Sequence, residues 1–167
     1  MAKTKVIGGF EFIEYSKETY NESETIKRSK EFHEWMDKRR SVRDFSDKPI
    51  PKEVIENIIC AASTAPSGAH KQPWTFAVIS NPELKSKIKE AAEKEEYESY
   101  TKRMSEEWLD DLKPMQTDWN KPFLEIAPYL IIVFIKAYDL DEKGNKHTNY
   151  YVNESVGLAA GMLLSAI

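Results

Sequence analysis

Apolar residues recur along this chain with a helical period in some stretches and as continuous runs in others, and these patterns predict its elements. The clearest helical stripe follows Pro51, a residue suited to the first helical position. Its apolar members are Val54, Ile55, Ile58, Ile59 and Ala62. The helix should end near Thr64, because Pro66 disfavours helical geometry in the residue before it.

Two apolar segments predict strands. Trp74–Ser80 is rich in β-forming residues and stops at an Asn-Pro pair. Tyr129–Lys136 is an almost continuous apolar run, which is typical of a buried central strand. The run is far too short to span a bilayer, so no membrane partner is expected.

Further helices are expected at 31–38, Pro82–Glu93, Pro122–Ala127 and Tyr150–Ile167. The last has a broad apolar stripe, and its two glycines stand four residues apart, which permits another helix to approach closely. It stops at Ile167 without a glycine, a cap or a polar tail, so we expect the sequence to be the front part of a longer protein. Residues 1–30 are mostly polar and are interpreted as an N-terminal arm, with one domain at 31–167.

Charge and cysteine content exclude some classes of protein. The chain has 24 basic and 28 acidic residues and a net charge of -4, which argues against a nucleic-acid partner. Cys60 is the only cysteine, so no intrachain disulfide can form and a reducing cytoplasm is the expected compartment. Because Cys60 lies on or beside the apolar stripe, we expect an inert core thiol. His33 and His147 lack ligand-type partners at suitable spacing, so no metal site is expected.

The stretch Arg39-Arg40-Ser41-Val42-Arg43 places three guanidinium groups and a hydroxyl within five residues. Arginine presents a rigid fork of donors that matches phosphate oxygens, so the cluster suits a fixed anion. The alternative is a solvated helix end, where cations complement the helix dipole. A turn is predicted at 65–70, because proline fixes its own φ and Gly68 has unrestricted φ. His70 is interpreted as a turn residue rather than a general acid.

The segment 89–121 combines ten acidic and six basic residues with four large aromatic side chains. These are Tyr97, Tyr100, Trp108 and Trp119. A solvated helix does not need four aromatics, whereas a mobile lid that closes over a flat, partly polar molecule would use them. Glu96 and Tyr100 are four residues apart and so share a helical face. Lys121 could join them only through tertiary folding.

Taken in order, these motifs resemble the nitroreductase superfamily of FMN-dependent proteins, from about residue 34 to the end. The shared order is Arg-x-Ser-x-Arg, a Pro-x-x-Val-Ile helix, Ala-Pro-Ser-Gly-Ala-His and a Pro-Trp-x-Phe strand. Glu96, Tyr100 and Lys121, with their neighbours, are similar to one branch, the iodotyrosine deiodinases. The resemblance implies an α+β fold with a central, mostly antiparallel sheet flanked by helices, in an intertwined homodimer that holds each flavin between subunits.

FMN is the cofactor that the resemblance implies. Arg39, Arg40 and Ser41 match positions near the phosphate, and Arg43 matches a position beside the N1/C2-carbonyl edge of the flavin. A fixed cation at that edge would raise the electron affinity of the flavin. The full set of matched cofactor positions is Arg39, Arg40, Ser41, Val42, Arg43, Pro66, Ser67 and Gly68.

A halotyrosine is the substrate that the resemblance implies, with its ring stacked on the flavin. Glu96 would face the ammonium group, Tyr100 and Lys121 the carboxylate, and the Ala69 backbone amide the phenolate oxygen. No residue is assigned as a catalytic acid or base. Two alternatives stay open: a general NAD(P)H-dependent nitro- or quinone reductase of the same fold, and a truncated chain that binds flavin without catalysis.

Overall fold

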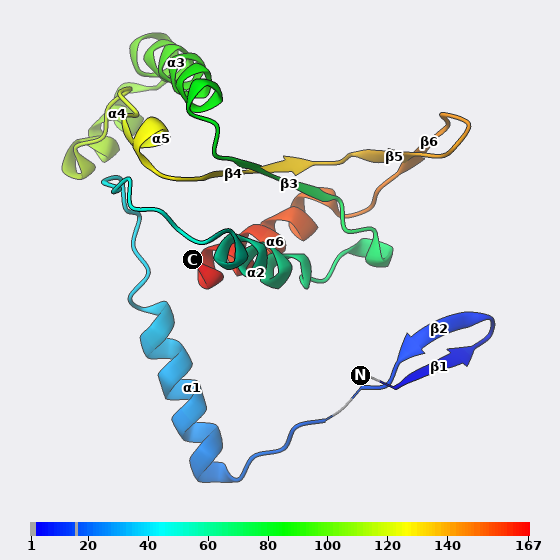
Figure 1. The fold of residues 1–167 in the computed structure, drawn as a ribbon. Helices are drawn as coiled ribbons and strands as arrows, with labels where there is room; N and C mark the ends of the chain where they lie inside the picture. The colour runs from blue at the N-terminus through cyan, green and yellow to red at the C-terminus, as the bar shows by residue number, and fades with distance from the viewer. Residues whose placement is uncertain (1–2, 16) are drawn as a thin grey trace. The chain divides into compact units, whose positions relative to one another are not determined.

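The structure is a computed structural model that describes residues 3–15 and 17–167. The chain forms two compact units, Met1–Arg40 and Ser41–Ile167. Figure 1 shows their elements. The expected boundary at residue 30 falls inside a helix, and the division between the units comes at Arg40 instead.

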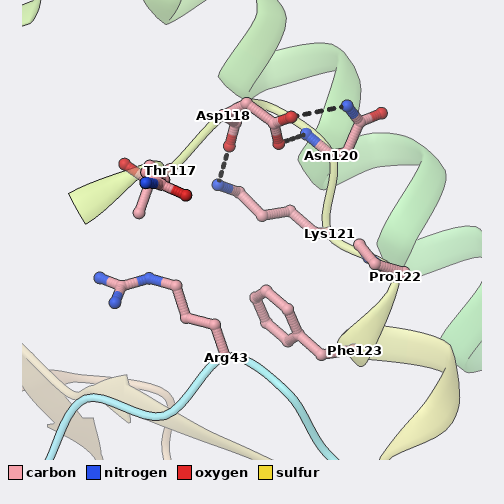
Figure 2. A pocket seen from close by; sticks show the side chains of 8 residues that line it. Arg43, Thr117, Asp118, Asn120, Lys121, Pro122 and Phe123 are labelled. Carbon is pink, nitrogen blue, oxygen red and sulfur yellow. Dashed lines mark hydrogen bonds between the residues drawn. The ribbon is translucent and has the colours of Figure 1, made fainter. Parts of the chain in front are cut away.

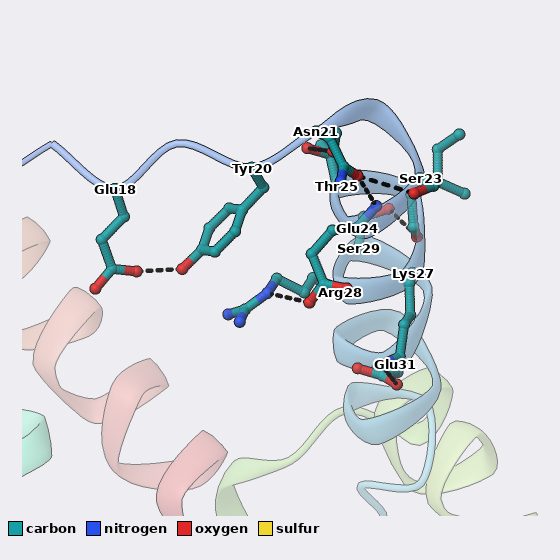
Figure 3. Close-up of polar contacts among 11 residues, drawn as sticks. Glu18, Tyr20, Asn21, Ser23, Glu24, Thr25, Lys27, Arg28, Ser29 and Glu31 are labelled. Atoms are coloured by element: carbon teal, nitrogen blue, oxygen red, sulfur yellow. Dashed lines mark hydrogen bonds and ion pairs between the residues drawn. The ribbon is translucent and has the colours of Figure 1, made fainter.

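The first unit holds a hairpin and a helix. Strands β1 (Thr4–Ile7) and β2 (Phe10–Ile13) pair antiparallel, with Thr4 opposite Ile13. Helix α1 (Glu22–Met36) begins nine residues before the predicted start at residue 31. Its start depends on polar contacts that an apolar period does not report (Figure 3): the Asn21 side chain accepts a hydrogen bond from the Glu24 amide at 2.9 Å, and Glu24 pairs with Arg28.

The second unit is built on two antiparallel strands and two helices that pack on each other. Strand β3 (Trp74–Ile79) pairs with β4 (Leu130–Ile135), with Trp74 opposite Ile135. Helix α2 (Lys52–Ser63) packs on α6 (Val152–Ala166), which also contacts β4. A small buried core joins α6 to the sheet. It consists of Ala65, Trp74, Val156 and Ala159, with Phe76, Val133, Val152 and Met162 packed against it.

The remaining elements of the second unit lie toward the two ends of the β3–β4 pair (Figure 1). Helix α3 (Pro82–Glu98) runs into a π-helical turn at Ser99–Arg103, and α4 (Glu106–Leu112) and α5 (Phe123–Ile126) follow. Strands β5 (Tyr138–Leu140) and β6 (Lys146–Thr148) form a hairpin. The α+β class and the antiparallel pairing are confirmed. No helix in the described ranges is long and apolar enough to cross a membrane.

Burial differs from the sequence prediction at three places. Among the residues that the structure describes, β4 pairs with β3 alone and is partly exposed, so the prediction of a buried central strand is wrong. Val54 is exposed, because α2 buries only Ile55 and Ala62 of the expected stripe. Cys60 is also exposed, so its interpretation as a core thiol is wrong. A period identifies an apolar face, but the neighbours that cover it come from the tertiary fold.

Candidate functional site

Lys121, which is distant in the sequence, meets the neighbouring pair Glu96 and Tyr100 beside helix α3. The Lys121 ammonium nitrogen lies 3.2 Å from a Glu96 carboxylate oxygen and 5.8 Å from the centre of the Tyr100 ring. Glu96 is on the last turns of α3, and Tyr100 is in the π-helical turn that continues it. The Lys121 side chain is 19% exposed and the Glu96 side chain 38%, so the lysine is largely shielded from water while the carboxylate is partly open to it.

The loop 116–121 holds Lys121 in place through its own polar contacts (Figure 2). The Lys121 ammonium donates to the Asp118 carbonyl at 2.6 Å. The Asp118 carboxylate accepts from the backbone and side-chain nitrogens of Asn120, and these bonds lower the pKa of Asp118. The Tyr100 hydroxyl donates to the Thr117 hydroxyl at 3.1 Å. The loop therefore orients both the lysine and the tyrosine.

Arg43 and Lys121 line the same hollow, which has a volume of about 240 Å³ (Figure 2). Its other lining residues are Gln116, Thr117, Asp118, Asn120, Pro122 and Phe123. Phe45 stacks at a tilt on Phe123, with ring centres 5.9 Å apart, and so fixes the Arg43 loop to helix α5. The Arg43 guanidinium contacts only the Ser41 carbonyl, at 3.4 Å, and forms no ion pair with any residue that the structure describes.

The other members of the arginine cluster are placed differently. Arg39 and Arg40 belong to the first unit, where the Arg40 guanidinium donates to the carbonyls of Asp37 and Arg39. Ser41 and Val42 belong to the second unit and are exposed, and neither lines the hollow. Of the three expected cofactor residues of this stretch that belong to the second unit, the structure brings Arg43 alone to the Lys121 group.

The turn at 66–70 has a different backbone from the predicted one. Ala69 and His70 adopt positive φ, at 49° and 55°, whereas Gly68 does not. Gly68 is required for space instead, because a Cβ there would lie 2.8 Å from the Tyr150 carbonyl oxygen. The prediction that Gly68 provides unrestricted φ is therefore wrong.

Two hydroxyl groups hold this turn. The buried Ser155 hydroxyl accepts from the Gly68 amide at 3.3 Å, and Ser67 accepts from the Gln72 amide at 2.9 Å. The backbone hydrogen bonds of the turn use the amides of His70 and Lys71. The exposed Ala69 amide has no partner among the described residues.

The two groups of candidate residues lie at opposite ends of helix α2 in Figure 1. Segment 41–50 precedes the helix and segment 64–70 follows it. Twelve helical residues separate them, a rise of about 18 Å. No hydrogen bond or ion pair between described residues joins the turn to the Arg43 group.

Several residues of the site were not predicted from the sequence. Thr117, Asp118 and Asn120 orient Lys121 and Tyr100, and Phe45 anchors the Arg43 loop. The Asp-x-Asn spacing is a local signal for a side-chain turn, and it could have marked the loop as ordered. The Phe45–Phe123 contact joins residues 78 positions apart and leaves no local signal.

Comparison with known proteins agrees with this arrangement. Residues 36–167 match the model of the Nitroreductase family. The iodotyrosine deiodinase of Haliscomenobacter hydrossis is 62% identical over 156 residues, which cover 93% of this chain and 70% of that protein. The iodotyrosine deiodinase of Hydra vulgaris is 51% identical over 157 residues, which cover 94% of this chain and 58% of that protein.

A solved structure is similar over most of the chain. It is a crystal structure of oxidized iodotyrosine deiodinase bound to FMN and 3-iodo-L-tyrosine, with a TM-score of 0.70 and 32% sequence identity. The match covers 81% of this chain and 67% of that one. The chain belongs to the nitroreductase family, and within it to the iodotyrosine deiodinase branch.

Proposed function

We propose that this chain forms the flavin- and substrate-binding part of an enzyme that reductively removes halogen from halotyrosines, iodotyrosine among them. The observation that carries the proposal is the group of Glu96, Tyr100 and Lys121, which folding brings together beside Arg43. Relatives named iodotyrosine deiodinase, up to 62% identical, support the substrate class.

The chemistry of the Arg43 loop fits FMN. Arg43 is a cation without an ion-pair partner among the described residues, and it faces a hollow that already contains Lys121. Such a cation favours the negative charge that a reduced flavin carries at its N1 edge. When bound, FMN would supply the electrons for cleavage of the carbon–halogen bond. Arg39, Arg40 and Ser41 stay predicted phosphate contacts, with Val42 beside them.

The substrate would be recognised by an exchange of ion pairs. In the structure Glu96 and Lys121 neutralise each other across 3.2 Å. A zwitterion placed between them lets Glu96 face its ammonium group and Lys121, with the Tyr100 hydroxyl, its carboxylate, so neither charge is left unpaired. A neutral nitroaromatic offers neither partner. The site therefore favours amino acids over other flat aromatics.

The phenolate end of the substrate would be held by the turn at 66–70. The left-handed backbone at Ala69 leaves its amide free among the described residues, so the amide can donate to the phenolate oxygen. Fixing that oxygen helps the ring to tautomerise and accept electron density at the halogen-bearing carbon. Pro66, Ser67 and Gly68 shape this turn and are the predicted flavin contacts on the same loop.

The separation of the two groups supports a homodimer. Because helix α2 stands between the Arg43 loop and the Ala69 turn, a flavin that contacts both is best served by two copies of the chain. Leu158 and Leu164 of α6 are 53% and 57% exposed, an apolar surface that a partner would cover. The single cysteine supports a cytoplasmic location.

The substrate assignment predicts a clear effect of two substitutions in the enzyme loaded with FMN. Glu96→Gln or Lys121→Ala should weaken halotyrosine binding about 10- to 100-fold, because each removes one charge-assisted contact. Titration of 3-iodotyrosine against flavin fluorescence measures the affinity, and the flavin absorbance shows that FMN stays bound. Glu95→Gln is the matched control, because Glu95 pairs with Arg103 on the exposed side of the same helix.

Unchanged affinity in both variants would remove Glu96 and Lys121 from the substrate site. The alternative of a general nitro- or quinone reductase predicts that neutral nitroaromatics, rather than tyrosine-like zwitterions, quench the flavin. The alternative of a non-catalytic chain predicts a protein without flavin absorbance when FMN is supplied. Intact mass and the visible spectrum distinguish that case first.

A further inference from the structure

One face of helix α3 and of the π-helical turn that continues it is lined by charged and polar residues that meet the loop carrying Lys121. These residues stand at helical spacings of four, three and four, and they are Lys89, Glu93, Glu96 and Tyr100. Glu96 and Tyr100 belong to the proposed substrate group. Glu93 lies one turn before them and has a different partner. Its carboxylate accepts a hydrogen bond from the backbone amide of Lys121 at 2.8 Å.

We propose that Glu93 is a positioning residue, which fixes the backbone of Lys121 and thereby places the lysine ammonium group opposite Glu96. The inference rests on the function proposed above. Glu93 does not reach the substrate in this arrangement. It holds Lys121, which does reach the substrate. Because Glu93 and Glu96 are on α3 and Tyr100 is in the turn that continues it, the three substrate groups keep fixed positions relative to one another.

The Lys121 amide depends on this bond. Pro122 follows directly and has no amide hydrogen, and the Asn120 amide already donates to Asp118, so no adjacent backbone donor replaces it. The side chains of Glu93 and Lys121 are each 19% exposed, so water reaches them poorly. A partly buried amide that loses its acceptor is left unsatisfied, and the loop would shift to find water.

The carboxylate of Glu93 is itself held in position by a network between α3 and α5. The Lys89 ammonium lies 3.5 Å from Glu93 and 3.3 Å from Glu125. The bond to Glu125 is the main cause that raises the pKa of Lys89, so this bridge stays charged at neutral pH. One turn earlier, the buried Lys85 ammonium donates to the carbonyls of Glu125 and Ala127, each at 2.8 Å.

These contacts form a rigid connection between α3 and the segment 121–127. Lys85 and Lys89 join the helix to α5, and Glu93 extends the connection to Lys121, two residues before α5. Only the Glu93 bond ends on a member of the substrate group. Substitutions at Glu93 should therefore change the affinity for substrate while the contacts of Lys85 still hold the fold.

Two conservative variants of the FMN-loaded protein separate positioning from charge. Glu93→Gln removes the charge but keeps an oxygen of the same reach, so it should bind 3-iodotyrosine within about threefold of the unchanged protein. Glu93→Asp keeps the charge but is one methylene shorter, so it should bind about tenfold more weakly. In Glu93→Asp, KM should rise while kcat stays nearly constant, because flavin and ring are not touched, and in Glu93→Gln both should stay close to their unchanged values. Glu90→Gln, at an exposed position of the same helix, should have no effect.

The reverse order, with Glu93→Asp intact and Glu93→Gln weakened, would show that the ion pair with Lys89 matters and would overturn the inference. Equal affinity in all variants would overturn it as well. Loss of FMN or of thermal stability in step with the affinity would indicate a purely structural role and also overturn it. If the unchanged protein does not bind 3-iodotyrosine at all, it is the proposed function that fails, and this outcome differs from all the others.

Discussion

At the scale of single residues, the turn at 66–70 shows how one sequence motif can be required for a reason other than the expected one. Glycine in a turn usually supplies positive φ. Here positive φ falls on Ala69 and His70, and Gly68 provides the room in which the turn approaches the Tyr150 carbonyl. The strained backbone at Ala69 leaves its amide without an internal partner in the described chain, which is the property that the proposed phenolate contact needs.

This assignment predicts responses of different size at neighbouring positions. Gly68→Ala should lower the free energy of unfolding by about 1–3 kcal/mol, because the new Cβ would be forced against backbone. Ala69→Gly should change it by less than about 1 kcal/mol, since relief of left-handed strain offsets the greater freedom of the unfolded chain. Urea unfolding measures both. A larger loss at Ala69 than at Gly68 would show that the glycine acts through φ after all.

At the scale of elements, side-chain hydrogen bonds fix a helix start and a hairpin turn that the hydrophobic pattern does not predict. Asn21 caps α1 well before the apolar residues of that helix begin. In the hairpin β5–β6, Asp141 accepts bonds from the Asn145 amide at 2.8 Å and from the Asn145 side chain at 2.9 Å, and it lies 3.2 Å from a His147 ring nitrogen. The hairpin thus depends on one carboxylate.

The carboxylate of Asp141 makes the hairpin sensitive to acid. Hydrogen bonds, first of all from the Asn145 side chain, lower the pKa of Asp141 from 3.8 to about 2. Because the folded pKa is the lower one, the stabilisation is complete above about pH 4 and is lost as the pH falls toward 2. A carboxyl NMR titration should show this pKa. Asp141→Ala should make the Asn145 amide exchange about five- to tenfold faster at pH 6, and an unchanged exchange rate would contradict the role.

At the scale of the whole molecule, helix α6 would form the contact between subunits in the proposed homodimer. Gly157 and Gly161 have no atom within 4 Å of an added Cβ, so this face is open in one chain. Leu158 and Leu164 beside them are exposed. Small residues let helix backbones approach closely, and such a surface suits a symmetric contact between two copies. The proposed flavin contact between subunits further requires that the Arg43 loop of one copy lie within reach of the Ala69 turn of the other.

A bulky residue at Gly157 tests this assembly. Gly157→Leu should shift the FMN-loaded protein from dimer to monomer in sedimentation velocity and should lower its flavin content. Lys87→Leu, a similar apolar change on the exposed side of α3, should leave both unchanged. If Gly157→Leu stayed dimeric with full flavin, another face would have to form the interface. A monomeric unchanged protein would rule out the homodimer itself.

The sequence by itself determined the elements and the identity of the chemical groups. Trp74–Ser80 and Pro82–Glu93 were identified because alternation, helical period and proline act locally, and β3 and α3 confirm them. The motif around Glu96, Tyr100 and Lys121 indicated the family, which the comparisons confirm. Local chemistry is enough for both, because each depends on residues that are close in the chain or on their order.

Only the tertiary structure decided which of these groups share a site and which surfaces are covered. Phe45 on Phe123 brings Arg43 to Lys121, although 78 residues separate them. Packing of α2 on α6 through one narrow face leaves Val54 and Cys60 exposed, and the Tyr150 carbonyl makes Gly68 necessary. Such contacts join distant segments, and their geometry follows from how the whole unit packs, so no period or spacing along the chain reports them.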